Sequence, residues 1–265
     1  MGVALPVALT IAGSDPSGGA GVQADLKTFH QFGVYGQAVI TLLTVQNTVG
    51  VTRVECMASD LVAEQIRAVV SDIPPAAAKT GALGNREIIE AVAGLAADFR
   101  FPLIVDPVLV SKHGAALLAP GAIDVLKTRL LPRAFLVTPN LEEAAMLAAI
   151  EVSDVDSMRA AARKILALGP QAVLVKGGHL AAGDAIDVLL NEGEWTEFTA
   201  PRVATCHTHG TGCTYSAAIT ACLAAGQELP TAIRNAKRYI TEAIRTNPGL
   251  GRGSGPVNHH APANA

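Results

Sequence analysis

The sequence predicts an α/β protein in which helices cover both faces of a central, mainly parallel β-sheet. Short aliphatic runs that end in Gly, Asp, Asn or Pro recur along the chain, and amphipathic stretches separate them. Fully apolar runs of this length are typical of strands buried on both faces, and their alternation with helices indicates βαβ units. Half of the residues are hydrophobic but only 4% are aromatic, so the core must be aliphatic. The 265 residues show no internal repeat or low-complexity linker, and we expect one domain over residues 1–265.

The individual elements follow from these runs and from helix-capping residues. The runs predicted as central strands are residues 7–11, 38–44, 103–105, 134–137 and 172–175. Asp60 is the expected N-cap of a helix over residues 61–71, and Asn85 is the expected cap of a helix that reaches residue 97. Asp156 is expected to start a helix that ends at residue 168.

Two further segments differ from this pattern. Residues 51–57 alternate between apolar and polar, which predicts an edge or lid strand. Residues 185–190 and 195–199 are predicted to pair as a hairpin.

The charges and cysteines limit what the protein binds and where it acts. With 20 basic and 23 acidic residues, the chain lacks the basic field of a protein that coats nucleic acid. No 18 apolar residues occur in a row, so no membrane span is expected. The four cysteines are too few for a disulfide scaffold. The apolar start of the chain lacks the basic region and cleavage site of a signal peptide, and we expect a cytoplasmic protein.

The first chemical signal is a glycine-rich loop over residues 12–21, between the first strand and a helix that contains Asp25. Glycines at such a turn let the backbone approach a ligand closely. The loop is neither a Rossmann fingerprint nor a P-loop. By itself it fits a tight turn with a polar cap equally well, and Asp25 alone fits a solvated helix residue.

The second signal is the segment 207–214, which contains three short polar residues, two glycines and Cys213 before an apolar helix. Backbone N–H groups at a helix N-terminus bind anions, and the same positive end predicts a lowered pKa for the Cys213 thiol. The turn therefore supplies an anion cradle and a candidate base. Zinc ligation by Cys206, His207, His209 and Cys213 is disfavoured, because their spacing matches no common zinc pattern.

Polar residues also follow other predicted strands. Asn140 and Glu143 form either a helix capping box or a ligand-binding pair. Lys176 stands beside a glycine-lined turn and fits either a phosphate-binding or a solvated lysine, and Asp106 closes another strand. Because ligands of parallel α/β sheets bind at the carboxyl ends of the strands, we expect these loops to meet at one edge.

Together these segments resemble the ribokinase-like superfamily of small-molecule kinases, and within it the hydroxymethylpyrimidine/phosphomethylpyrimidine kinases of thiamine biosynthesis. The resemblance covers nearly the whole chain. The blocks that carry it are residues 12–29, 45–48, 138–144, 175–179, 209–218 and 255–259.

The resemblance implies a ribokinase-like fold with a small β lid and a kinase that uses ATP and Mg²⁺. It would phosphorylate 4-amino-5-hydroxymethyl-2-methylpyrimidine and then its monophosphate, giving the pyrophosphate. The residues implied in the anion hole are Gly210, Thr211, Gly212 and Cys213, with Cys213 where most relatives have an Asp base. Those implied around the pyrimidine are Gln46, Gly13, Asp25 and Val108. Those implied for nucleotide and magnesium are Lys176, Asn140, Glu143 and Asp106. We also expect a homo-oligomer, specifically a dimer, with no nucleic-acid or membrane partner.

Two departures and three alternatives remain. Ala82 replaces a Met that commonly packs on the pyrimidine, and Ser254 replaces a common His. Some bacterial pyridoxal kinases share the Cys of segment 207–214, which we call the anion loop. Pyridoxal is therefore the alternative substrate. A ligand sensor without turnover is disfavoured because every motif is filled. A Cys–His hydrolase is disfavoured by the glycine loop and by the expected lack of a partner that orients the histidine.

Overall fold

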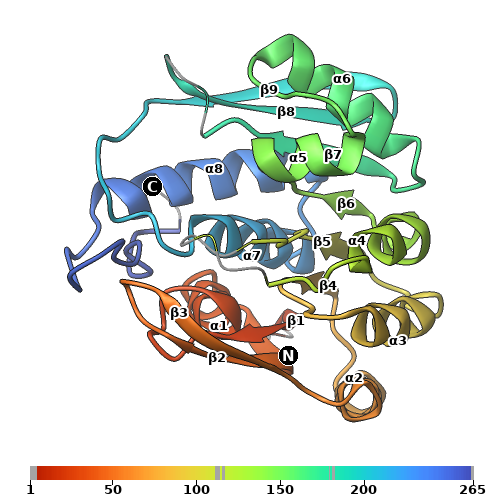
Figure 1. The fold of residues 1–265 in the computed structure, drawn as a ribbon. Helices are drawn as coiled ribbons and strands as arrows, with labels where there is room; N and C mark the ends of the chain where they lie inside the picture. The colour runs from red at the N-terminus through yellow and green to blue at the C-terminus, as the bar shows by residue number, and fades with distance from the viewer. Residues whose placement is uncertain (1–4, 111–113, 115–116, 179, 181–182, 264–265) are drawn as a thin grey trace.

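The computed structural model describes residues 5–110, 114, 117–178, 180 and 183–263, and these residues form one nine-stranded sheet between two layers of helices (Figure 1). The strand order is β3-β2-β1-β4-β5-β6-β7-β8-β9. The six central strands, β2, β1, β4, β5, β6 and β7, are parallel to one another. The edge strands β3, β8 and β9 each run antiparallel to their neighbours. The predicted α/β class is confirmed. The strands are β1 (Val7–Ser14), β2 (Tyr35–Gln46), β3 (Val51–Cys56), β4 (Ala77–Thr80), β5 (Leu103–Val105), β6 (Leu136–Val137), β7 (Ala172–Lys176), β8 (Ala185–Asn191) and β9 (Glu194–Ala200).

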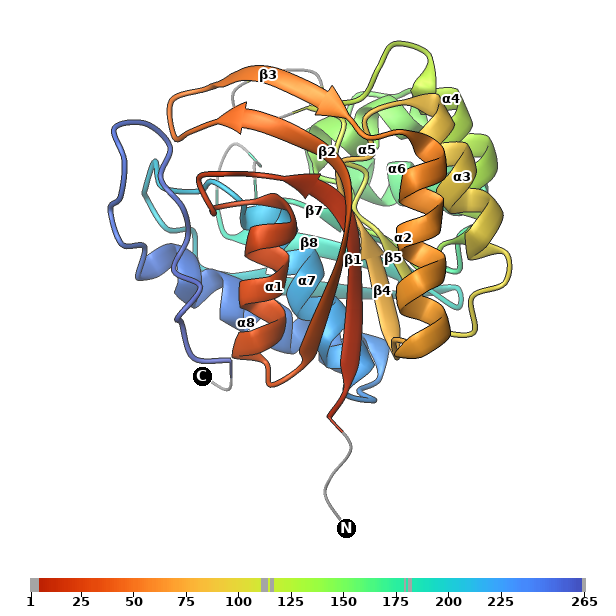
Figure 2. The same ribbon diagram turned by 90° about the horizontal axis from the view of Figure 1, so that it is seen from below.

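The helices divide between the two faces of the sheet (Figure 2). One apolar core joins the sheet to α2, α3, α4, α5 and α6, and two others join it to α1, α7 and α8. No helix among the described residues is long and apolar enough to cross a membrane. The helices are α1 (Gly21–Gln31), α2 (Ser59–Asp72), α3 (Arg86–Ala96), α4 (Ala122–Val125), α5 (Leu141–Ala148), α6 (Val155–Leu166), α7 (Thr211–Ala224) and α8 (Leu229–Arg245), with a π turn at Leu126–Leu130 and a 3₁₀ turn at Leu131–Arg133.

The predicted strands are all present, and the structure adds one that the sequence analysis missed. This strand, β4, lies between β1 and β5 at the centre of the sheet. Its short sequence is interrupted by Lys79, which is completely buried. A lysine at a central strand position hides the apolar run that would otherwise reveal the strand.

The helix starts were predicted with mixed success. Asn85 caps α3 as expected, because its side chain accepts a hydrogen bond from a backbone amide of the first turn. Asp60 was the wrong cap for α2, which begins after Ala58 without a side-chain cap. Asp156 was also wrong, since Asp154 caps α6 through a capping box. Both misassigned carboxylates lie in the first turn, where they favour the positive end of the helix.

The predicted lid strand and hairpin are confirmed as β3 and as the β8–β9 pair. The ladder between β1 and β2 ends at Leu43, and the last residues of β2 pair with β3. This two-stranded extension forms the lid of the carboxyl edge (Figure 2).

Candidate active site

A cavity of about 680 Å³ lies at the carboxyl ends of the parallel strands. It brings together every site residue predicted from the sequence except Asp25. These residues are Gly13, Gln46, Asp106, Val108, Asn140, Glu143, Lys176, Gly210, Thr211, Gly212 and Cys213. His179, the last residue of one of the resembling blocks, lies outside the described residues.

The anion loop enters α7 through Gly210, whose φ of +78° is in the left-handed region. A Cβ at this position would collide with the carbonyl oxygen of Gly19, so the turn requires glycine. The next amides stand at the N-terminus of α7, where a helix leaves its first N–H groups without internal partners. A Cβ on Gly212 would lie 3.4 Å from Lys176 Nζ and 3.8 Å from Asp106 Oδ2. The loop therefore faces a cationic and an anionic side chain at close range.

The lowered pKa predicted for Cys213 is wrong. Burial raises the pKa of this thiol to about 12, and Asp25 and Asp106 add to the effect while Lys79 opposes it. The amide of Gly21 donates toward the sulfur, but this contact does not offset desolvation. At neutral pH the side chain is therefore a thiol.

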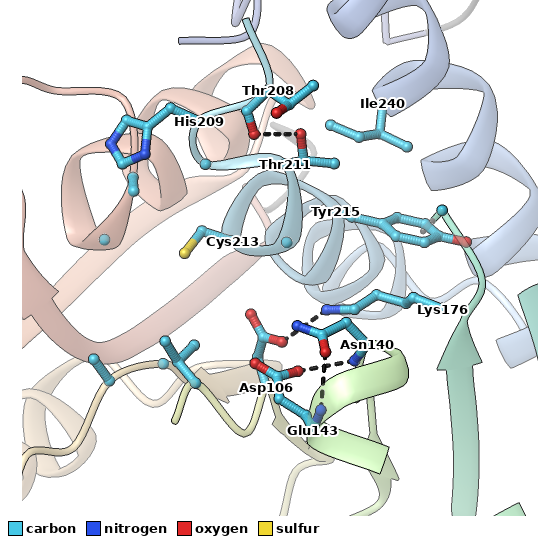
Figure 3. A pocket seen from close by; sticks show the side chains of 18 of the residues that line it. Asp106, Asn140, Glu143, Lys176, Thr208, His209, Thr211, Cys213, Tyr215 and Ile240 are labelled. Carbon is cyan, nitrogen blue, oxygen red and sulfur yellow. Dashed lines mark hydrogen bonds and ion pairs between the residues drawn. The ribbon is translucent and has the colours of Figure 1, made fainter. Parts of the chain in front are cut away.

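Lys176 and Asp106 form an ion pair across the cavity wall, with 3.0 Å between Nζ and Oδ1 (Figure 3). Asp106 also accepts hydrogen bonds from Thr138 Oγ1 and Ser216 Oγ, each at 3.2 Å. Burial favours the neutral carboxyl, but Lys176 and Lys79 outweigh it and lower the pKa of Asp106. The alternative of a solvated Lys176 is excluded, since only 12% of its side chain is exposed.

Asn140 and Glu143 form the capping box of α5 and also line the cavity (Figure 3). The amide of Asn140 donates to Glu143 Oε2 at 2.8 Å, and the amide of Glu143 donates to Asn140 Oδ1 at 2.9 Å. Burial raises the pKa of Glu143 to about 7, with Lys176 opposing and Asp106 adding to this shift. Asn140 and Glu143 can therefore cap α5 and face a ligand in the cavity at the same time.

Asp25 differs from both of its sequence-based interpretations. Its side chain is completely buried and does not line the cavity. Asp25 Oδ2 accepts hydrogen bonds from Lys79 Nζ at 2.8 Å and from Thr10 Oγ1 at 2.6 Å. The carboxylate lies on the face of α1 that packs against the sheet, so the structure does not place it against a pyrimidine in the cavity.

Sequence reasoning missed a pair between Asp15 and His209. Asp15 Oδ2 lies 2.7 Å from His209 Nε2, and both side chains are less than 5% exposed. Burial opposes ionisation of Asp15, but hydrogen bonds from His209 and Ser17 outweigh it and lower its pKa. Asp15 lies in the glycine-rich loop 12–21 and His209 lies in the segment 207–214. The two residues are 194 positions apart, so no local sequence pattern indicates their contact.

This pair corrects one argument against a Cys–His hydrolase, because His209 does have a carboxylate partner. In Figure 3, however, the His209 ring and the Cys213 sulfur do not point toward one another. The side chains considered for zinc have separate surroundings as well. Cys206 is exposed, His207 Nδ1 accepts from the amide of Gly255 at 3.1 Å, and His209 pairs with Asp15.

Ala82 and Ser254, the two positions at which the chain departs from the family that it resembles, lie close to the site. Ala82 lines the cavity, and its carbonyl accepts a hydrogen bond from Thr41 Oγ1 at 2.6 Å. Ser254 Oγ donates to the carbonyl of Cys206 at 2.8 Å and so ties the carboxyl-terminal segment to the start of the anion loop.

Comparisons with known proteins agree with this geometry. The family model for phosphomethylpyrimidine kinase matches residues 15–258. A hydroxymethylpyrimidine/phosphomethylpyrimidine kinase of Streptomyces coelicolor is 50% identical, over 96% of this chain and 94% of that protein. A thiamine biosynthesis bifunctional protein of Geobacter sulfurreducens is 52% identical over 95% of this chain, which spans about half (51%) of that longer protein. The ADP complex of Bacillus subtilis pyridoxal kinase is 39% identical with a TM-score of 0.90, covering 97% of this chain and 98% of that one.

Proposed function

Because the chain belongs to the phosphomethylpyrimidine kinase family and is a hydroxymethylpyrimidine and phosphomethylpyrimidine kinase of thiamine biosynthesis, we propose how its residues divide this work. One observation carries the proposal. The anion loop contacts Gln46 of the lid through His209 and approaches Lys176 and Asp106 through Gly212, in a single cavity. The pyrimidine binds on the side of Gln46, and the phosphates of ATP bind on the side of Lys176.

The proposed pyrimidine subsite consists of groups from three strand ends. The Gln46 amide offers a donor and an acceptor, which suits the edge of an aminopyrimidine. Gly13 and Val108 line the same cavity and present backbone and apolar surface to the ring. Asp25 does not line this subsite and pairs with the buried Lys79 instead.

The proposed phosphate subsite is built from Lys176, Asn140 and Glu143. Lys176 supplies the positive charge that a triphosphate requires. The amides of Gly210, Thr211, Gly212 and Cys213 are placed to stabilise negative charge on the transferring group, at about 3 kcal/mol per donor in comparable sites. Phosphoryl transfer depends mainly on such positioning and charge neutralisation.

Asp106 and Glu143 are the proposed magnesium-binding residues. Carboxylate oxygens are the protein ligands that Mg²⁺ prefers, and it usually takes one or two of them together with substrate phosphates. The donor set fits this ion, because Asp106 and Glu143 line the same cavity and their mutual repulsion, which adds to the raised pKa of Glu143, would be relieved by a cation. When bound, the ion neutralises charge on the phosphates.

Cys213 is the proposed proton acceptor for the alcohol. Its thiol pKa of about 12 means that ligand binding must lower this pKa before the sulfur can act as a base. The monophosphate needs no such base, because its acceptor oxygen is already ionised.

Pyridoxal is the second candidate substrate, and the structural similarity to a pyridoxal kinase favours testing it. A coupled assay of ADP release with the pyrimidine alcohol, its monophosphate and pyridoxal separates the candidates. We expect turnover with both pyrimidines, and Lys176→Met serves as the inactive control. Turnover with pyridoxal alone would reassign the substrate, and binding without ADP release would favour a sensor.

We also propose that the protein is a homodimer that associates through its lid. Leu43, Val45 and Val49 are exposed apolar residues on β2 and the turn that follows it. Light scattering after size exclusion tests this, and Val45→Lys should shift the mass to that of a monomer.

A further inference from the structure

The side-chain amide of Gln46 lies between two neighbours in the cavity wall. Gln46 Nε2 is 3.3 Å from His209 Nε2, and Gln46 Oε1 is 3.2 Å from Thr44 Oγ1. His209 Nε2 in turn lies 2.7 Å from Asp15 Oδ2. All four residues line the cavity. One ring nitrogen of His209 therefore faces both Asp15 and Gln46.

The hydrogen on His209 Nε2 determines which end of the amide faces it. The carboxylate of Asp15 accepts from the amides of Ser17 and Ala20, each at 2.9 Å, and has only acceptor atoms to offer His209. His209 Nε2 must then carry a hydrogen, whether the ring is neutral or charged. A nitrogen that carries a hydrogen cannot accept one from an NH₂ group. The end of the Gln46 amide that faces His209 is therefore its oxygen.

The contacts at the other end of the amide fit the same orientation. Thr44 Oγ1 has a single hydrogen and two neighbouring oxygens, the Ser14 carbonyl at 3.0 Å and Gln46 Oε1 at 3.2 Å. With the Gln46 oxygen turned toward His209, Thr44 donates to Ser14 and accepts from the NH₂ group of Gln46. The oxygen and nitrogen of the Gln46 amide are nearly equal in size. A half-turn about the Cγ–Cδ bond exchanges these two atoms and leaves the distances to His209 and Thr44 nearly unchanged.

We propose that Asp15 and His209 are positioning residues for substrate specificity, which hold the Gln46 amide with its oxygen toward His209 and its nitrogen toward Thr44. The inference deepens the proposed function and rests on it, since Gln46 there pairs with the pyrimidine. A 4-aminopyrimidine edge offers an amino donor beside a ring-nitrogen acceptor. The 4-oxo counterpart offers a carbonyl acceptor beside an N–H donor. An amide held in one orientation matches one of these orders and opposes the other.

The test compares kcat/KM for the 4-amino and 4-oxo pyrimidine alcohols. Wild type should prefer the 4-amino compound by about a hundredfold or more, because a mispaired edge leaves buried polar groups without partners. His209→Leu removes the donor and frees the Gln46 amide to turn, so this preference should fall at least about tenfold. His209→Gln places an N–H group at a similar reach and should restore most of the preference. Thr44→Val removes the acceptor at the other end and should lower the preference even if His209→Leu does not fold.

His207→Leu is the matched control. His207 stands two residues earlier in the same loop and does not belong to the described cavity lining. Its substitution should leave the preference between the two pyrimidines unchanged. In a Gln46→Leu background, His209→Leu should change the preference by less than about twofold, because its effect is transmitted through Gln46.

Calorimetric binding of the same two pyrimidines without nucleotide separates the possible failures. Discrimination in binding without ADP release would overturn the proposed kinase reaction but leave the proposed orientation of the Gln46 amide standing. Turnover with an unchanged preference in both His209→Leu and Thr44→Val would overturn the inference alone. A loss of preference that persists in the Gln46→Leu background would also overturn it.

Discussion

Lys79 Nζ lies 2.8 Å from Asp25 Oδ2, and neither side chain has any exposed surface. The pair ties α1 to β4 directly below the cavity. A Cβ added to Gly81 would lie 3.6 Å from Lys79 Nζ. Asp25 Oδ1 has no hydrogen-bond partner among the described residues. The charge of each group is thus compensated mainly by the other.

Removal of one member of this pair should destabilise the protein strongly. Lys79→Met leaves the Asp25 carboxylate buried without its cation, which typically costs about 3–5 kcal/mol. Lys79→Met combined with Asp25→Asn removes both charges and should recover part of this loss. Urea unfolding of the three variants measures the effect. A cost below about 1 kcal/mol for Lys79→Met would show that the pair is not a structural element.

Local sequence signals predicted the parts of the site that depend on strand ends. Asp106, Asn140 and Lys176 each follow an aliphatic run, and the carboxyl ends of parallel strands necessarily share one edge. The glycines of the anion loop were equally visible, because the left-handed φ of Gly210 excludes a side chain.

The pairings between distant residues could not be predicted in this way. Asp15 and His209 meet only because the first glycine loop and the anion loop pack together, and no spacing encodes that contact. The pKa of Cys213 was predicted in the wrong direction for a related reason. The helix terminus is a local feature, whereas the burial that outweighs it is a property of the whole fold.

The high pKa of Cys213 predicts slow alkylation. At about pH 8, iodoacetamide should modify the exposed Cys206 at least about a hundredfold faster than Cys213, since only the thiolate reacts. Mass spectrometry of the digested protein gives both rates in one experiment. Comparable rates for the two cysteines would mean that the helix terminus outweighs burial.

Cys213→Ala should separate the two phosphorylation steps. Loss of a general base typically costs about 10²–10⁴-fold in rate, so turnover of the alcohol should fall by this factor. Turnover of the monophosphate should fall much less, because its acceptor oxygen carries no proton to remove. Steady-state kinetics with each acceptor measures the split. Equal losses would assign Cys213 to the shape of the anion hole.

Gln46→Leu should weaken pyrimidine recognition while leaving the nucleotide subsite intact. Ring atoms buried without hydrogen-bond partners cost about 1–3 kcal/mol, or roughly tenfold to a hundredfold in kcat/KM. The KM for ATP should remain within about twofold, because Lys176 and Glu143 do not share the contact. An unchanged kcat/KM for the pyrimidine would remove Gln46 from the site.

The raised pKa of Glu143 predicts that the unliganded enzyme loses stability as pH rises. Its carboxyl titrates near 7 in the folded chain and near the ordinary value of 4.5 in the unfolded chain. The folded state therefore binds the proton more tightly, and this contribution is complete below about pH 4.5 and is lost as pH rises through about 7. A shift of this size corresponds to about 3 kcal/mol.

Glu143→Gln should remove this pH dependence, because glutamine stays neutral and can still complete the capping box with Asn140. Without nucleotide, the variant should be more stable than wild type at about pH 8 and nearly equal to it at about pH 5. Thermal unfolding at the two pH values measures the difference. The exposed neighbour Glu142 provides the control, since Glu142→Gln should change stability by less than about 0.5 kcal/mol at either pH. Kinase activity of Glu143→Gln should nevertheless fall, because the variant loses a carboxylate proposed to hold magnesium. A stability difference that is the same at both pH values would contradict the raised pKa.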